Sequence, residues 1–523
     1  MSDAVKTIRL PNIWDELSGK MRRLNAYEWA FLIVLIVQLS VLVYFNLFTL
    51  KEHMGYDTSW IYLKSFLIWK EKALTSANWV EQTSPFLDSA MLLAALFFGI
   101  TKNIFVSYGM ANCLILFIVL IVIYQITRDL NFSPIIRFLV LNLIMCPYLI
   151  SGFDARNDLG YFSNFLGGAC VYTLRTLLGL IIIKNMIDLR KGRHNIALVI
   201  ISALLCILTG VSSGVFITVM FIFPCIIYII ISVLINNDIK VLFLSQYIYI
   251  YICLLLNIIG KVYSKEVFGF DVIDSSRTWT SIERIWINIG AVIQGFMKIM
   301  NVLPATDTEV SITSAKGIIY TMPLFVFLML FVSLILVIRK CAKSFNRINQ
   351  DILPLVSVIL CNIVMFSLFN VSYGSAIFEE RYLISTFIFL LIILGYFLNS
   401  LKPKHLFTMV LIGLIFLANL GNTIISNYRY AVLGTNKNWQ MKEISQIAEN
   451  ERTDLIYVYN SDIIGRSLRA FDTSRIYKNI KDSEEYMHWG DYLTYENNAD
   501  YTGRTLLLVD KIISNNIPKP VRR

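Results

Sequence analysis

The sequence predicts an all-α polytopic membrane protein with about eleven transmembrane helices and a small α/β appendix at the C-terminus. Of the 523 residues, 56% are hydrophobic and only 16% are charged, and the mean hydropathy is +0.63. A soluble domain carries roughly 25% charged residues. Apolar runs of about 20 residues, long enough to cross a hydrocarbon core of roughly 30 Å, recur along most of the chain.

The net charge of +10 does not indicate a nucleic-acid partner, because the basic residues lie mainly in short loops between the apolar runs. Loops that are rich in Lys and Arg stay in the cytoplasm and orient the chain. The segments predicted to be cytoplasmic on this rule are residues 1–28, Arg190-Lys191-Gly192-Arg193, Arg339-Lys340 with Lys343 and Arg347, and Lys402 with Lys404.

The predicted spans are residues 29–50, 104–126, 135–152, 162–187, 195–211, 214–235, 240–260, 316–339, 351–371, 382–400 and 405–426. The first is interpreted as a retained span, because it lacks a small-residue cleavage site. The segments predicted to lie outside are 51–103, 153–161, 261–315, 372–381 and 427–523. The chain therefore divides into a cytoplasmic segment (1–28), a transmembrane domain (29–426) with its outer loops, and an extracytoplasmic α/β domain (427–523).

One apolar stretch does not fit as a span. Leu87 to Ile100 is about 14 residues long, which is short for a crossing. Counting it as a span would also move the Arg190 cluster outside, against the charge rule. It is predicted to be a juxtamembrane or re-entrant helix. In the tail, a helical pattern at 441–450 and strand-like runs at 454–460 and 505–510 predict the α/β domain.

The outer segments carry the ionisable residues that could do chemistry. A carboxylate can take the proton of an acceptor hydroxyl, Arg suits phosphate by its fork geometry, and Mg²⁺ or Mn²⁺ would neutralise a leaving phosphate. Each charge also has a plain structural interpretation, as a solvated residue, a local ion pair or the mark of a span end. The four histidines are scattered and do not predict a metal site. The candidates are Asp57, Asp154, Asp158, Lys261, Arg277 and Arg381.

The order of features in the first outer segment carries a family resemblance. Asp57 follows the first span, an aromatic-rich helix is predicted from Trp60 to Lys72, and Asn78-Trp79-Val80 precedes Pro85 and an apolar stretch ending near Gly99. This order resembles the first outer loop of the GT-C superfamily of polyprenyl-phosphate-sugar-dependent glycosyltransferases. The bacterial members akin to protein O-mannosyltransferases and the lipid A aminoarabinose transferases are the most similar.

Two later segments show the same likeness. ARNDLGYFSNF at 155–165 is similar to a second outer loop in which an acidic residue leads into an aromatic-rich span. Arg381-Tyr382 looks like the Arg-Tyr pair that opens a late span in bacterial members. The chain departs from the commonest first-loop motif, Asp-Glu, because Asp57 is followed by Thr58. The second carboxylate of that motif is therefore missing here.

The resemblance implies an inverting glycosyltransferase at the outer face of the membrane. Its donor would be a polyprenyl-phosphate sugar, its acceptor a glycan, lipid or protein, and its surroundings the membrane lipids. The implied roles are acceptor activation or metal binding for Asp57, the second acidic position for Asp158 or Asp154, and donor-phosphate contact for Arg381, Arg277 or Lys261.

Two other classes stay open on the sequence. A flippase of lipid-linked oligosaccharides explains the many spans, but it explains the outer segment 51–103 poorly and would carry buried charges in mid-span, of which the sequence shows few. An O-antigen-type polymerase would use a large loop deeper in the chain, such as 261–315. A high content of Ile, Asn and Lys indicates a bacterial source, and hence the plasma (inner) membrane and a cell-envelope glycan.

Overall fold

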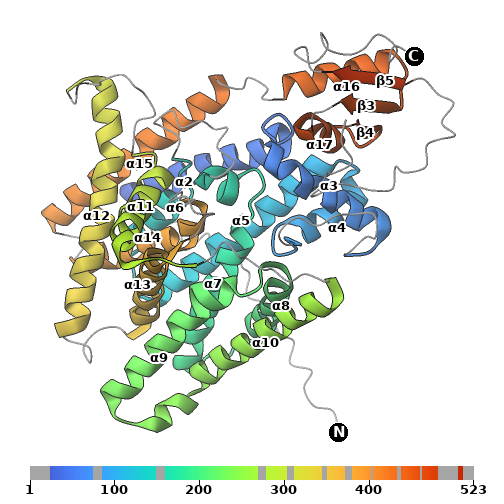
Figure 1. Ribbon diagram of the computed structural model, residues 1–523. Coiled ribbons are helices and arrows are strands. Elements are labelled where there is room, and N and C mark those ends of the chain that lie inside the picture. Colours follow the sequence, from blue (N-terminus) through green and yellow to red (C-terminus); the bar gives the residue numbers. More distant parts are fainter. Residues whose placement is uncertain are drawn as a thin grey trace, which may run out of the picture.

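A computed structural model of the chain describes residues 24–74, 85–148, 160–268, 278–302, 311, 313–343, 350–370, 380–401, 405–432, 438–459, 462–480 and 505–509. Most of these residues are helical (Figure 1). The first helices are α2 (Ala26–Tyr44), α3 (Tyr56–Glu71), α4 (Met91–Thr101), α5 (Ile104–Asp129), α6 (Pro134–Ile144), α7 (Thr173–Arg190), α8 (Ile196–Ser213) and α9 (Phe223–Asn236). The later helices are α10 (Ser245–Phe268), α11 (Ile282–Ile299), α12 (Ala315–Lys343), α13 (Leu353–Leu368), α14 (Ile384–Ser400), α15 (Leu406–Val432), α16 (Trp439–Asn450) and α17 (Asp462–Phe471).

Short elements complete the fold. The strands are β1 (Thr278–Trp279), β2 (Phe369–Asn370), β3 (Leu455–Tyr459), β4 (Ile476–Ile480) and β5 (Thr505–Val509). The π-helical turns are η1 (Phe45–Thr49), η2 (Phe162–Leu166) and η3 (Thr218–Ile222), and the 3₁₀ turns are η4 (Ile239–Phe243), η6 (Gln350–Ile352) and η7 (Glu380–Leu383).

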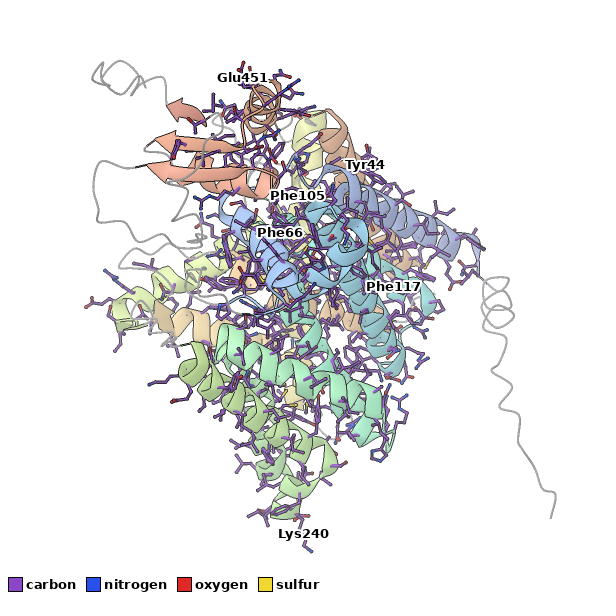
Figure 2. The ribbon with its side chains drawn as sticks, turned by 90° about the vertical axis from the view of Figure 1, so that its right-hand side faces the viewer. Tyr44, Phe66, Phe105, Phe117, Lys240 and Glu451 are labelled. Atoms are coloured by element: carbon purple, nitrogen blue, oxygen red, sulfur yellow. The ribbon has the colours of Figure 1, made fainter. Side chains whose placement is uncertain are left out.

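The polytopic membrane fold is confirmed. Within the described ranges, nine helices are long and apolar enough to cross a membrane, and they coincide with nine of the eleven predicted spans. Large apolar side chains on the outside of the bundle, such as Tyr44 and Phe117, point away from it (Figure 2). Exposed apolar side chains of this kind are what a lipid-facing surface requires, because lipid tails are as apolar as the side chains themselves.

The two remaining predicted spans differ from expectation. The one at 135–152 becomes the shorter α6, because Pro147 excludes the helical conformation at the residue before it. The one at 162–187 is interrupted after η2 at Gly167 and Gly168, where φ of Gly168 is +85°, a left-handed value that favours glycine. Its continuation, α7, has the length of a span but carries four ionisable residues.

Leu87 to Ile100 was predicted to be too short for a span, and the structure agrees. Its helix, α4, has only 11 residues and packs between α3 and α5. The outer segment predicted at 261–315, by contrast, is more regular than expected. It holds the end of α10 and the amphipathic α11, which packs against α13 and buries Asn288, Val292 and Phe296 at four-residue spacing.

The core of the bundle is α14. It contacts α6, α7, α12 and α13, and every side chain from Ile384 to Leu394 is buried. The apolar window of this helix is 83% buried, against 33–61% for the other candidate spans. A helix that is apolar on all sides is stable only when protein surrounds it. Residues at the start of α14 are therefore held inside the bundle.

Ion pairs gather at one end of the bundle, among loops that were predicted to be cytoplasmic. Arg193 lies 2.9 Å from Asp129 of α5 and 2.7 Å from Asp188 of α7, and Lys184 contacts the same two carboxylates. Asp129, Asp188 and Lys184 are all nearly fully buried. Pairing and hydrogen bonding are what make such burial tolerable.

The same end includes η6, which precedes α13, and the end of α14. Asp351 lies 2.6 Å from Arg190 and 3.0 Å from Lys191. The amide of Asn399, at the end of α14, accepts from the backbone of Ser133 at 2.8 Å. We call this region the ion-paired end.

The C-terminal unit consists of α16, α17 and a three-stranded parallel sheet in the order β4-β3-β5. Leu455 of β3 pairs with Ile476 of β4 and Thr505 of β5. The helix and the two strands predicted for the tail are confirmed, while α17 and β4 were not predicted. Figure 2 places Glu451 of this unit and Lys240 of η4 at opposite ends of the molecule.

A polar network around Asp472 organises this unit. The Asp472 carboxylate accepts from Ser445 at 2.9 Å and Tyr477 at 3.1 Å, and it pairs with Arg475. Burial by itself would raise the pKa of Asp472. Hydrogen bonds from Ser474, Arg475 and Ser445, with the charge of Arg475, more than offset this and hold the pKa below its usual value.

Candidate active site

The first candidate, Asp57, is the second residue of α3. Gly55 is the N-cap, and the Thr58 hydroxyl closes the cap, with its oxygen 3.1 Å from the Gly55 nitrogen and 3.0 Å from the Gly55 oxygen. Met54, Gly55 and Thr58 are buried. The first turn of a helix favours a negative charge. The backbone of Asp57 is thus fixed in a position suited to a carboxylate, whereas its side chain lies outside the described residues.

Arg381 lies in η7, which leads directly into the buried helix α14. It is half-buried, and its guanidinium carbon lies 5.5 Å from the ring of Tyr382. η7 also contacts α11. The predicted Arg-Tyr pair therefore lies just before the N-terminus of α14, in a turn that contacts the amphipathic α11.

A short antiparallel ladder joins β1, which precedes α11, to β2, which follows α13. Thr278 pairs with Asn370 and Trp279 with Phe369. Arg277 lies outside the described residues, but it directly precedes Thr278 in the chain. The ladder thus brings the start of α11 and the end of α13 together.

The loop that holds Asp154 and Asp158 lies outside the described residues, but both of its ends are fixed. Tyr148 and Tyr161 flank it, with ring centroids 5.8 Å apart. Both rings also pack edge-on against Phe387 of α14, at 5.7 and 5.5 Å. The described residues on both sides of the loop therefore pack against the N-terminal part of α14, about one turn after η7 ends.

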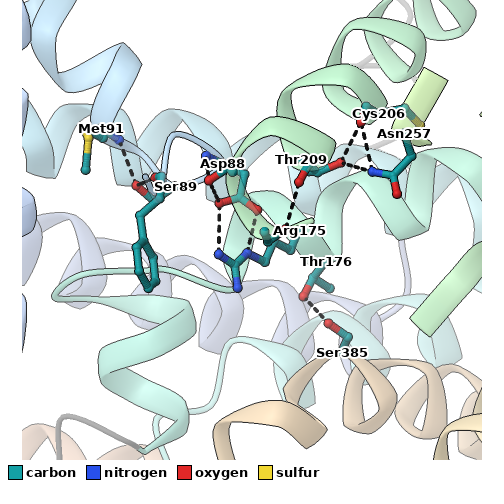
Figure 3. Close-up of polar contacts among 12 residues, drawn as sticks. Asp88, Ser89, Met91, Arg175, Thr176, Cys206, Thr209, Asn257 and Ser385 are labelled. Atoms are coloured by element: carbon teal, nitrogen blue, oxygen red, sulfur yellow. Dashed lines mark hydrogen bonds and ion pairs between the residues drawn. The ribbon is translucent and has the colours of Figure 1, made fainter. Parts of the chain in front are cut away.

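The best-defined polar group near the start of α14 is a buried ion pair that the sequence analysis missed. Arg175 donates to Asp88 through Nε at 2.7 Å and through Nη2 at 2.9 Å. The Ser212 hydroxyl donates to the same carboxylate at 2.6 Å. Figure 3 shows Asp88 facing the guanidinium, while the neighbouring Thr176 points toward Ser385 of α14.

Ring contacts join α3 to α14 through this ion pair. Trp60, on the first turns of α3, packs edge-on against Phe86 at 4.9 Å. The guanidinium of Arg175 lies 5.5 Å from the Phe86 ring and 5.3 Å from the Tyr172 ring. Tyr172 in turn packs against Tyr382 at 6.2 Å. The helix that carries Asp57 and the turn that carries the Arg-Tyr pair belong to one packed unit.

These contacts limit which groups can do chemistry. Asp88 is fully buried, and both of its oxygens are engaged by Arg175, so it is poorly placed to take a proton from a substrate. Arg175 is likewise neutralised by that carboxylate. In the sequence, Asp88 and Arg175 could have been noticed because each is a single charge inside an apolar stretch. Lys261 lies exposed on α10, which contacts α7 and α8 rather than η7.

The sequence left open whether a divalent cation binds near the acidic candidates. Across the described part of the chain, no three His, Cys, Asp or Glu side chains converge on one point. The side chain of Asp57 and all of Asp154 and Asp158 lie outside that part. The structure thus provides no donor set against which Mg²⁺ or Mn²⁺ can be fitted, and the cation stays a prediction.

Comparisons with known proteins find likenesses among solved structures only. No protein-family model matches the chain, and no curated protein matches it. The solved structures that match include the Archaeoglobus fulgidus oligosaccharyltransferase in complex with Zn and sulfate, at 13% sequence identity and a TM-score of 0.42. The match covers 85% of this chain and 62% of that one. The chain thus spans less than two thirds of that structure.

Proposed function

We propose that the protein is an inverting membrane glycosyltransferase, which moves a sugar from a polyprenyl-phosphate donor to a cell-envelope acceptor. The observation that supports this most is the packing of α3 against the start of α14 through Trp60, Phe86, Arg175, Tyr172 and Tyr382. These contacts bring the helix of the acidic candidate and the turn of the basic candidate into one unit, at the end of the bundle away from the ion-paired end.

In the proposed reaction, the acceptor hydroxyl attacks the anomeric carbon of the donor sugar. The bond between that carbon and the phosphate oxygen breaks, polyprenyl phosphate leaves, and a single displacement inverts the configuration. Asp57 orients the hydroxyl and takes its proton. Arg381 contacts the phosphate as negative charge develops on it, because a guanidinium matches two phosphate oxygens. The geometry of α14 suits this role, since its start is held inside the bundle.

The other candidates have secondary roles in this proposal. Asp158 or Asp154 is the second acidic residue, and either would help to hold Mg²⁺ or Mn²⁺ if the reaction uses one. Arg277 is the second phosphate contact, because the β1–β2 ladder holds its chain neighbour Thr278 opposite Asn370, and α11, which follows β1, contacts η7. Lys261 is a weaker candidate than the sequence alone suggested, because its helix, α10, packs mainly against α8 and α7.

The test is sugar transfer by the purified protein from a set of radiolabelled undecaprenyl-phosphate sugars. Wild type and Asp57→Asn are compared, with Asp238→Asn as the matched control. Asp238 is exposed and caps η4 near the opposite end of the molecule, and Asn caps as well as Asp. We expect wild type and Asp238→Asn to transfer sugar, and Asp57→Asn to lose about 100-fold or more in rate.

Each outcome has a clear reading. Transfer by Asp57→Asn at the wild-type rate would remove that carboxylate from the mechanism. A well-folded wild type that uses none of the donors would contradict the proposal and favour the flippase or the polymerase. Repeating the assay with a chelator and then with added Mg²⁺ or Mn²⁺ tests the cation directly.

A further inference from the structure

The C-terminal unit contacts the transmembrane domain at the turn that precedes α3. The side-chain amide nitrogen of Asn438 lies 3.0 Å from the carbonyl oxygen of Lys51, 3.3 Å from that of Glu52 and 3.1 Å from that of Met54. Asn438 is only 7% exposed. Three backbone carbonyls of one turn therefore converge on a single amide group that is almost 400 residues away in the chain.

The position of Asn438 in its own helix makes this contact unusual. Asn438 is the N-cap residue of α16, where an Asn side chain ordinarily accepts from the backbone of its own helix. Here the side chain does not cap α16. It donates to the turn at 51–54 instead, and the helix forgoes a stabilising cap.

Two further contacts strengthen the same junction. The ammonium group of Lys51 lies 3.9 Å from the ring centroid of Phe471, at the end of α17, and 5.9 Å from that of Phe105 on α5. α17 also packs along α3, as Figure 1 shows. Burial at this junction lowers the pKa of Lys51, an effect that the charge of Asp472 opposes and that of Lys442 reinforces.

We infer that Asn438 is a positioning residue for the proposed transfer reaction, because it fixes the turn that sets the start of α3 and hence the backbone of Asp57. This inference rests on the proposed function. Met54 is the last residue of the turn, Gly55 caps the helix, and Asp57 is two residues further on. A shift of the turn is therefore passed directly to Asp57, with no flexible segment between them.

The amide donor is the feature that matters. The Met54 carbonyl oxygen is buried, so the loss of its donor is destabilising, because water does not replace the bond. Asn438→Asp has nearly the same shape, but it places a carboxylate against three carbonyl oxygens and repels the turn. Asn438→Gln keeps the donor on a longer side chain. Gln440→Ala changes an exposed residue of the same helix and serves as the control.

The activity test compares the four proteins in the undecaprenyl-phosphate sugar assay. A displacement of about 1 Å of a catalytic group can cost about 100-fold, so we expect Asn438→Asp to lower kcat by about 10- to 100-fold. KM for the donor is expected to change by less than about twofold, since no donor contact is removed. Asn438→Gln should recover part of the rate, and Gln440→Ala should match wild type.

A second measurement does not depend on activity. Hydrogen exchange followed by mass spectrometry should show faster exchange at residues 54–60 in Asn438→Asp than in Gln440→Ala. Strand β3 should stay protected in both, which shows that the C-terminal unit is folded. Unchanged exchange at 54–60, or a wild-type kcat despite faster exchange, would overturn the inference.

The two proposals fail differently. If wild type transfers sugar and Asn438→Asp behaves like the control, only the positioning role is wrong. If wild type transfers no sugar from any donor, the proposed function is wrong and the catalytic consequence falls with it.

Discussion

Breaking the buried ion pair between Asp88 and Arg175 tests whether the turn before α4 is held to α7 by charge. Asp88→Asn keeps the shape of the side chain but removes its charge, so Arg175 is left buried and unpaired. Arg175→Met keeps much of the aliphatic stem and leaves the carboxylate with only Ser212 as a donor. The double variant removes both charges together.

The structure sets the size of the effect. The pair is bidentate, with distances of 2.7 and 2.9 Å, and its side chains are 0% and 7% exposed. Removing one partner of such a pair costs about 3–5 kcal/mol, whereas replacing both costs little. We therefore expect each single variant to lose at least about 3 kcal/mol, and the double variant to lose no more than either single one. The coupling energy is then about 3 kcal/mol.

The free energy of unfolding is measured by SDS titration of the detergent-solubilised proteins, followed by tryptophan fluorescence. A thermal midpoint under the same conditions gives a second reading of the order of stability. The reasoning would be refuted if each single variant lost less than about 1 kcal/mol, as at an exposed pair. It would be refuted equally if the losses in the double variant simply added.

Three more predictions concern the rest of the chain. The folded-state pKa of Asp472 is lowered, so the stability that this carboxylate contributes is present above its unfolded pKa of about 3.9 and is lost as pH falls through the folded pKa. The difference in thermal midpoint between wild type and Asp472→Asn should therefore be largest at pH 7 and should shrink below pH 4. Gly109→Val should give no folded protein in fluorescence-detected size-exclusion chromatography, because a Cβ at this position would lie 1.9 Å from the Asn46 carbonyl oxygen. A Cβ at Gly413 meets nothing within 4 Å, so Gly413→Ala should behave as wild type. Equal yields of the two variants would contradict this prediction. If the ion-paired end is cytoplasmic, His194→Cys in a cysteine-free background should react with a membrane-impermeant maleimide only after the membrane is opened, and labelling of intact cells would reverse the orientation.

Much of the fold could be predicted, because a span is defined by length and apolarity and needs no partner. Nine spans were found in this way. The errors arose where a local break outweighed the apolar run, at Pro147 and at Gly167 and Gly168. The helix α11 was overlooked for another reason. Its period of buried residues is clear, but Glu283 and Arg284 on its exposed side suggested a loop.

The site was harder to predict, because its contacts join distant parts of the chain. Asp57 and Arg381 could be selected from their places in the outer segments. Asp88 and Arg175 could not be paired from the sequence, because they are 87 residues apart. Each is also a single charge in an apolar stretch, where it hardly changes the mean hydropathy. The bond from Asn438 to the turn at Lys51 crosses 387 residues, and no sequence pattern marks it.

The ion-paired end has a consequence for how the chain enters the membrane. Its described network sets four cations against three carboxylates, a net charge of only one: Lys184, Arg190, Lys191 and Arg193 against Asp129, Asp188 and Asp351. Within this network, the excess of basic residues that orients a membrane protein is therefore present in the nascent chain and almost cancelled after folding. Any attraction of this end to anionic lipid headgroups should therefore come from basic residues outside the network, such as Arg339, Lys340 and Lys343, and not from the four cations that help to set the topology.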